Sequence, residues 1–148
     1  MIYYLIASIL IAVAALFART KRAVLAAGIL FYAVQIAAAG LLLWGGLYDT
    51  TSAAFFTFDA LGTLFYLLLV VVSMYVFGHS EAYLQGEDLR SYRLYFALLM
   101  LLTTAIAGAY FANNLAVTWI FLEATTLCSA GIIYHRRTAQ ALEAAWKY

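Results

Sequence analysis

Residues Leu115 to Tyr134 read LAVTWIFLEATTLCSAGIIY, a stretch of twenty residues whose one formal charge is Glu123. About 20 apolar residues in a helix cross the roughly 30 Å hydrocarbon core of a bilayer. The stretch therefore predicts a transmembrane helix with a carboxylate near its middle. An ionised side chain at that depth costs roughly 2.5 to 3.5 kcal/mol, so it is seldom kept unless it faces a partner or an ion path.

The rest of the chain has the same apolar character. Of 148 residues, 68% are hydrophobic and 10% are charged, whereas ordinary globular proteins carry about 25% charged residues. The apolar runs predict five spans, at residues 2–18, 23–48, 60–78, 94–112 and 115–134, and the start of a sixth helix at 139–148. We expect residues 1–148 to form one transmembrane region, an all-α, polytopic transmembrane helix bundle with an up-and-down arrangement.

The basic residues predict how the bundle is oriented. They are Arg19, Lys21, Arg22, Arg90, Arg93, Arg136, Arg137 and Lys147. With five spans they share one side, and the opposite side, at residues 48–59 and 113–114, carries none. The positive-inside rule then places the N-terminus outside and the C-terminus in the cytoplasm. We expect a multi-pass protein of the cell's inner (cytoplasmic) membrane.

The connections predict short loops and local caps. Residues 49–59 are expected outside and 79–93 in the cytoplasm, and Asp59 is more simply the N-cap of the third span than a functional acid. Trp44, Tyr48 and Tyr134 lie at span ends and are expected to anchor the chain at the membrane interface.

Hydroxyl side chains surround Glu123 on a helical projection. Trp119, Thr126 and Ala130 share its face, and Thr125 and Ser129 form one flank. An acid in such a setting can hold or release a proton as its partner moves, which favours a proton-transfer role. The alternative is a protonated glutamic acid that hydrogen-bonds a neighbouring helix and fixes its packing.

Four other polar residues have two interpretations each. Lys147 is a second candidate for proton transfer, but a lysine at a helix end also fits snorkelling to the interface. Its position four residues after Glu143 favours a helical ion pair. Thr103 and Thr104 are candidates, with Thr125, Thr126 and Ser129, for a polar path, or they bond back to helix carbonyls. Gln35 is similarly ambiguous.

The sequence offers no recognisable cofactor site. Cys128 is the single cysteine, which excludes an intrachain disulfide and a cysteine-ligated zinc or iron-sulfur centre built from this chain alone. His79 and His135 lie at span ends rather than at matching depths, so a bis-histidine haem is not expected. No glycine-rich phosphate loop is present. We expect no cofactor or metal in this chain and no nucleic-acid partner.

Two segments resemble a known family. Phe56 to Tyr75 (FTFDALGTLFYLLLVVVSMY) and Asn113 to Ser129 (NNLAVTWIFLEATTLCS) resemble the N-terminal part of the proton-translocating, antiporter-like membrane subunits. Respiratory complex I, Mrp-type antiporters and group 4 membrane-bound nickel-iron hydrogenases share these subunits. The stretch LEATTLCSAGIIYHRRTAQALEAAWKY is most similar to the large antiporter-like subunit of formate hydrogenlyase and hydrogenase-4 type complexes.

The resemblance implies roles for two residues. In the family, a fifth-helix glutamate pairs with a seventh-helix lysine, and Glu123 matches the glutamate. Lys147 matches a basic residue that opens the sixth helix. The seventh-helix lysine and the two broken helices have no counterpart here, so the chain holds roughly the first third of such a subunit. The resemblance implies other membrane subunits as partners, including a chain that carries the missing lysine-bearing helices.

Three functions follow as hypotheses. The first is a proton-translocating antiporter-like subunit, or the N-terminal piece of a split or truncated one, in a membrane-bound oxidoreductase complex that couples redox chemistry in partner subunits to proton or sodium transport. Because the sequence stops within a helix that has just begun, a split or truncated subunit is favoured over a complete one. The second is a structural, non-conducting membrane subunit of such a complex. The third is a small oligomeric cation or drug/proton exchanger.

Overall fold

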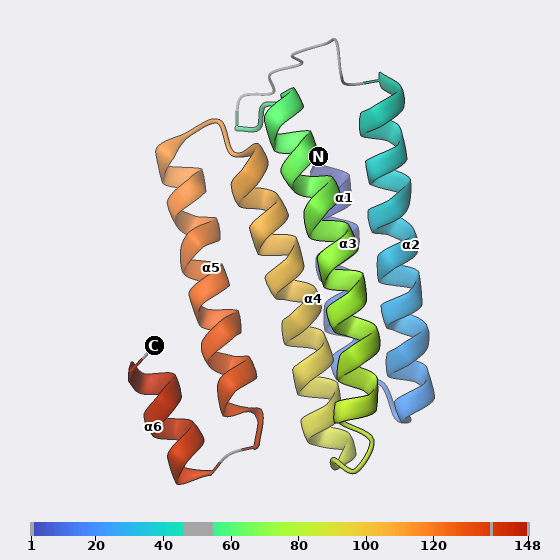
Figure 1. The fold of residues 1–148 in the computed structure, drawn as a ribbon, viewed down its shortest axis with the longest axis vertical. Coiled ribbons are helices and arrows are strands. Elements are labelled where there is room, and N and C mark those ends of the chain that lie inside the picture. Colours follow the sequence, from blue (N-terminus) through green and yellow to red (C-terminus); the bar gives the residue numbers. More distant parts are fainter. Residues whose placement is uncertain (1, 46–54, 137, 148) are drawn as a thin grey trace.

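The protein is described by a computed structural model that covers residues 2–45, 55–136 and 138–147. Its elements are α1 (Ile2–Leu16), α2 (Lys21–Gly45), α3 (Ala60–Tyr83), α4 (Leu89–Phe111), α5 (Leu115–Ile133), the 3-10 turn η1 (Tyr134–Arg136) and α6 (Ala139–Lys147). Helices α1 to α5 run up and down along one long axis, and α6 turns back beside the lower half of α5 (Figure 1). The predicted all-α class is confirmed.

Four of these helices are long and apolar enough to cross a membrane: α2, α3, α4 and α5, with 19 to 25 residues each. Helix α1 is apolar but has 15 residues, a length of about 22 Å at 1.5 Å per residue. A span of that length is short of the roughly 30 Å hydrocarbon core unless the bilayer thins or flanking residues extend it. The count of five spans stays a prediction, as does the orientation.

The helix ends differ from the ends of the apolar runs. The loop expected at residues 79–93 is reduced to residues 84–88, because α3 continues to Tyr83 and α4 begins at Leu89. The Asp88 side chain accepts a hydrogen bond from the Arg90 backbone amide at 3.3 Å and caps α4. Hydropathy marks where the membrane ends, whereas a helix continues into water as long as its residues favour it.

The predicted Asp59 cap is found, whereas the interface role of Trp44 and Tyr134 stays a prediction and other predicted details lie outside the described residues. The Asp59 carboxylate accepts a hydrogen bond from the Gly62 amide at 3.0 Å, as expected of an N-cap. Trp44 is exposed near the end of α2, and Tyr134 is half-buried where η1 begins. Residues 46–54, with Tyr48, as well as Arg137 and Tyr148, lie outside the described residues.

Helix α4 is the centre of the bundle, since it contacts α1, α2, α3 and α5. Eleven of its 23 residues are buried. Thr103 and Thr104 are each 2% exposed, and their hydroxyls donate to the carbonyls of Leu99 and Met100 at 2.9 Å. Both threonines therefore belong to the packed core and bond back to their own helix.

A small polar network joins the first three helices. Gln35 is fully buried in α2, and its side-chain oxygen accepts hydrogen bonds from the hydroxyls of Tyr4 at 2.5 Å and Tyr66 at 2.9 Å. Its amide nitrogen donates to Ser8 at 3.4 Å. A buried amide is costly without partners, so the network explains Gln35 as a structural residue that fixes α1 and α3 against α2.

One end of the bundle holds the α1–α2, α3–α4 and α5–α6 connections, and we call it the basic end (Figure 1). Lys21 donates to the carbonyls of Gln85 at 3.0 Å and Glu87 at 2.7 Å. Arg93 donates in the other direction, to the Ala18 carbonyl at 3.0 Å. The two cations thus tie the first connection to the second through carbonyls that follow helix ends, where positive charge is favoured.

Helix α5 packs on α4 through two glycines. A Cβ on Gly108 would lie 2.3 Å from the Phe121 ring, and a Cβ on Gly131 would lie 2.7 Å from the Leu98 side chain. Both distances are far below ordinary van der Waals contact. The absence of a side chain at each position lets α4 and α5 approach closely.

We predict that Gly108→Ala destabilises the purified chain by about 1 to 3 kcal/mol, because the Phe121 ring must move out of a packed site. Thermal unfolding in detergent measures the effect. The control is Gly40→Ala, where nothing lies within 4 Å of the added Cβ. Combining Gly108→Ala with Phe121→Val should recover part of the loss. Equal stability of the Gly108 and Gly40 variants would contradict the close approach.

Candidate functional site

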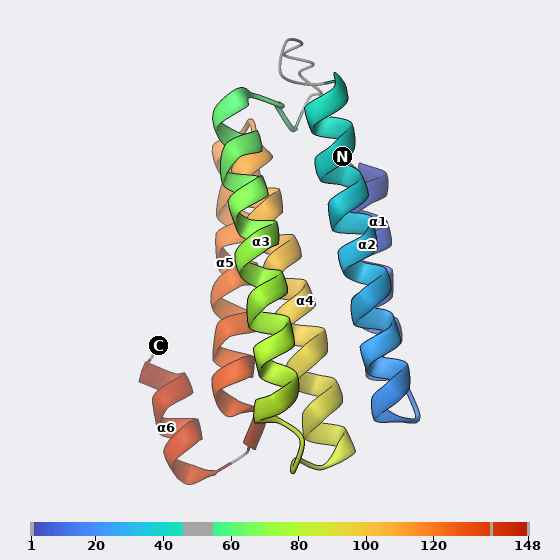
Figure 2. The same cartoon turned by 45° about the vertical axis from the view of Figure 1, so that its right-hand side comes forward.

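Helix α5 lies at the edge of the bundle (Figures 1 and 2). Cys128 is its one buried residue, and the side toward α4 also carries Phe121 and Gly131. The opposite side is exposed in the part of α5 above α6 (Figure 1), at Trp119, Ile120, Leu122, Glu123, Thr126 and Leu127. These six residues define what we call the open face of α5. Within the described residues, no other helix covers it.

Glu123 lies in the middle of the open face. Eight residues of α5 precede it and ten follow it, so its depth along the helix matches the sequence prediction. The side chain is exposed on the side of α5 opposite to the Gly108 contact. A carboxylate on this face would meet lipid or a partner helix in a bilayer, and lipid is the costly choice.

The hydroxyls expected beside Glu123 are engaged with the helix backbone. Thr125 donates to the Leu122 carbonyl at 2.7 Å, and Thr126 donates to the Glu123 carbonyl at 2.8 Å. Ser129 is half-buried one turn further on. Each hydroxyl keeps its acceptor lone pairs. These residues could therefore accept a hydrogen bond from a partner without breaking their present bonds.

The other candidates for the polar path lie elsewhere. Thr103 and Thr104 are buried in the α4 core, whereas Thr125, Thr126 and Ser129 are carried by α5. The structure therefore divides the five candidates between two helices.

Lys147 lies at the end of α6, away from the basic end. Its ammonium donates to the Glu143 carboxylate at 2.6 Å, which confirms the ion pair expected from their spacing. Both side chains are exposed. An exposed pair of this kind contributes about 0.3 to 0.5 kcal/mol, so it holds Lys147 only weakly.

Helix α6 turns back from the base of α5 in the direction of Glu123 (Figure 1). From Glu123 to the end of α5 the helix descends about 15 Å, and from Ala139 to Lys147 helix α6 climbs about 12 Å, at 1.5 Å per residue. Figures 1 and 2 both show α6 beside the lower half of α5. Helix α6 therefore carries Lys147 away from the connections to a level beside the lower half of α5, whereas the sequence prediction grouped it with the basic residues of the connections.

His135, at the base of α5, has surroundings that the sequence did not reveal. Its ring is buried, lies edge-on to Tyr95 at 5.3 Å, and places Nδ1 2.7 Å from the Ile132 carbonyl. A carbonyl only accepts, so Nδ1 carries the proton and the lone pair of a neutral ring lies on Nε2. Nε2 is buried without a hydrogen-bond partner among the described residues. In the sequence, the position of His135 at a span end was the only sign that its ring has a special environment.

Metal ligands do not gather in the described ranges. No group of three or more His, Cys, Asp or Glu side chains that could hold an ion occurs within residues 2–45, 55–136 and 138–147. Cys128 is a free thiol in the α4–α5 contact. The absence of a cofactor from the whole chain stays a prediction.

Comparison with known proteins finds one informative relative. Over 101 residues the chain is 29% identical to the hydrogenase-4 component F homolog of Methylacidiphilum infernorum (isolate V4). The match covers 64% of this chain and 21% of that protein, so the chain spans about a fifth of its relative's length. No family model and no solved structure matches the chain. The predicted resemblance is confirmed as distant, partial homology to this membrane subunit.

The open face predicts a difference in thiol reactivity between adjacent positions. In the purified chain, a cysteine introduced by Leu127→Cys in a Cys128→Ala background should react with a small maleimide about tenfold faster than native Cys128, because access limits thiol chemistry. Leu127 is 71% exposed and Cys128 is 9% exposed. Mass spectrometry of timed samples gives both rates. Equal rates would mean that α5 presents a different face to α4.

Proposed function

We propose that the chain is a proton-translocating antiporter-like subunit, or the N-terminal piece of one, in a membrane-bound oxidoreductase complex. Redox chemistry takes place in partner subunits, and this chain contributes a protonatable site to the coupled transport of protons or sodium. The observation that carries the proposal is Glu123, a carboxylate at the middle of an apolar helix on its open face. Distant homology to a hydrogenase-4 component F homolog supports it.

The open face indicates what Glu123 needs. A carboxylate left in lipid is expensive, and one covered by another protein helix can pair with a cation or exchange a proton with water held between the helices. The proposal therefore includes a second membrane subunit, or a further part of the same subunit, that covers α5 and brings a lysine to Glu123. The five-span arrangement with the N-terminus outside, in the inner (cytoplasmic) membrane, belongs to the same proposal.

Lys147 is proposed as the second proton-transfer group. It lies at the end of α6, which turns back beside the lower half of α5 (Figure 1), and its present partner is Glu143 on the surface of α6. A weak surface pair is easily exchanged for another. In this scheme Lys147 moves between Glu143 and a partner on the open face, while Thr126 and Ser129 offer acceptor oxygens near Glu123.

A structural, non-conducting role is the second candidate. It is favoured by the hydrogen bonds themselves, because Thr125 and Thr126 donate to backbone carbonyls and Lys147 is paired with Glu143. In that case Glu123 would be a neutral acid that fixes a partner helix by a hydrogen bond. The two functions differ in which property a substitution changes, proton transport or assembly.

We predict that Glu123→Gln lowers the number of protons moved per electron by roughly tenfold or more in inverted membrane vesicles, because the amide keeps the shape of the side chain but cannot exchange a proton. Quenching of a pH-sensitive dye, measured with the rate of electron transfer, gives this ratio. Glu123→Asp keeps a carboxyl group and should retain part of the transport. The control is Glu81→Gln, the same chemical change at an exposed residue near the basic end.

The assembled complex, isolated from the same membranes, separates the two functions. Normal assembly with lost transport supports proton translocation. Poor assembly with an unchanged ratio of protons to electrons supports the structural role, and a fully normal Glu123→Gln complex contradicts both.

A further inference from the structure

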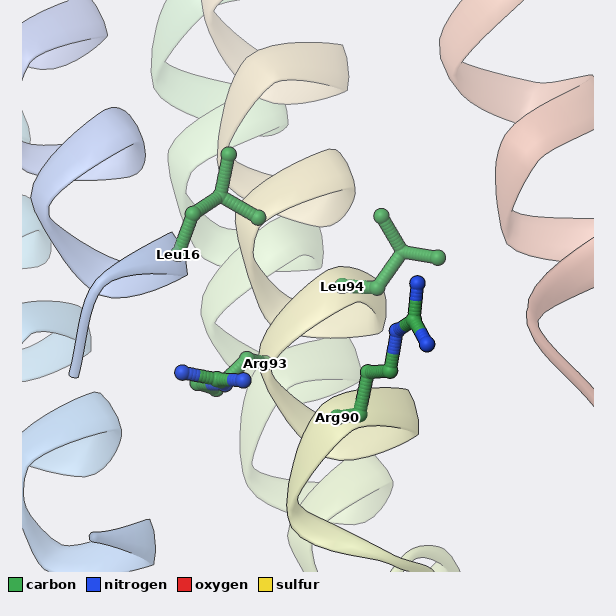
Figure 3. A pocket seen from close by; sticks show the side chains of 4 residues that line it. All are labelled: Leu16, Arg90, Arg93 and Leu94. Atoms are coloured by element: carbon green, nitrogen blue, oxygen red, sulfur yellow. The ribbon is translucent and has the colours of Figure 1, made fainter. Parts of the chain in front are cut away.

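A pocket of about 240 Å³ opens near the basic end, between α1 and the first turns of α4. It is lined by Leu16 from α1 and by Arg90, Arg93 and Leu94 from α4 (Figure 3). Figure 3 shows the Arg93 guanidinium on the side of α1 and the Arg90 guanidinium on the other side of the pocket, beside Leu94. None of these four residues takes part in the site around Glu123.

The two arginines are held in different ways. Arg93 is half-buried, points toward α1 (Figure 3) and donates from Nη1 to the Ala18 carbonyl at 3.0 Å. Arg90 is exposed, and its side chain extends along α4 toward Leu94 (Figure 3). The carboxylate of the neighbouring Asp88 accepts from the Arg90 backbone amide. One arginine is therefore fixed by the fold, and the other is placed at the open side of the pocket.

The lining indicates the chemistry of the ligand. A guanidinium presents several donors in a planar fork that matches two phosphate oxygens, and Arg93 keeps four N–H groups beyond the one bonded to Ala18. Leucine side chains gain nothing from a small hydrated anion but gain from contact with hydrocarbon. A ligand that uses all four residues carries a phosphate and an apolar chain together.

The position of the pocket agrees with this chemistry. It lies where the basic connections gather, at one end of an apolar bundle, and such an end lies at the level of lipid headgroups in a bilayer. Basic pockets between transmembrane helices at that level take up anionic headgroups. We propose that this pocket binds the phosphate of an anionic phospholipid, with Arg90 on the phosphate oxygens, Arg93 as a fixed positive charge on the α1 side, and Leu16 and Leu94 against the acyl chains.

The test uses the full chain in nanodiscs that contain phosphatidylcholine with a minor fraction of phosphatidylglycerol. After transfer to mild detergent, lipid mass spectrometry counts the phosphatidylglycerol that stays with the protein. Arg90→Gln should reduce it about fivefold, the effect of one arginine near a charged headgroup. Arg22→Gln is the matched control, since it removes the same charge from an exposed residue at the same end outside the pocket.

Further arms identify the source of the phosphate. Leu94→Ser should also lower retention of phosphatidylglycerol, because the acyl contact is lost, whereas Arg90→Lys should retain an intermediate amount. Equal losses of phosphatidylglycerol in the Arg90 and Arg22 variants would overturn the proposal. They would mean that the general positive charge of this end, and not the pocket, holds the lipid. Release of the lipid by millimolar inorganic phosphate would reassign the pocket to free phosphate and overturn the lipid. Unchanged retention in Arg90→Gln, with an unchanged melting temperature, would also overturn it.

Discussion

The packing of α4 against four neighbouring helices is the constraint on which the rest of the bundle depends. Its buried surface includes small and hydroxyl-bearing residues, and the hydroxyls of Thr103 and Thr104 are satisfied within the helix. Helix α5 is attached on one side, where Gly108 and Gly131 allow close contact. That attachment leaves the open face of α5 uncovered by the described chain. Glu123 is therefore exposed because α5 packs on α4 by its other side.

Polar groups inside this apolar chain fall into two kinds. Gln35 has hydrogen-bond partners from α1 and α3, and such internal satisfaction is what a low-dielectric interior requires. Glu123 faces outward, where the described chain provides no cover. The first kind holds the chain together, and the second is left for the proposed partner to cover. The difference separates a structural polar residue from a functional candidate more clearly than residue type does.

Much of the fold could be predicted from the sequence, because apolar runs, the Asp59 cap and the spacing of Glu143 and Lys147 are local signals. The short turn at residues 84–88 could not, since helices α3 and α4 extend beyond their apolar segments. The side of α5 on which Glu123 lies, packed or exposed, could not be predicted either. Helix α5 is apolar all round, so no periodicity shows which side is packed. The burial of His135 could not be predicted either, since it depends on tertiary contacts such as the Tyr95 ring.

The basic end has a consequence for how the chain tolerates change. Lys21 and Arg93 each bond carbonyls of the other connection, and the proposed orientation also rests on their positive charges. Each of these side chains therefore has a packing role and a proposed role in orientation. Substitutions that keep the charge but alter its reach, such as an exchange of Arg93 for lysine, would preserve the topological signal and still loosen the tie. At these two positions the structure therefore constrains the residue type more tightly than it constrains the charge.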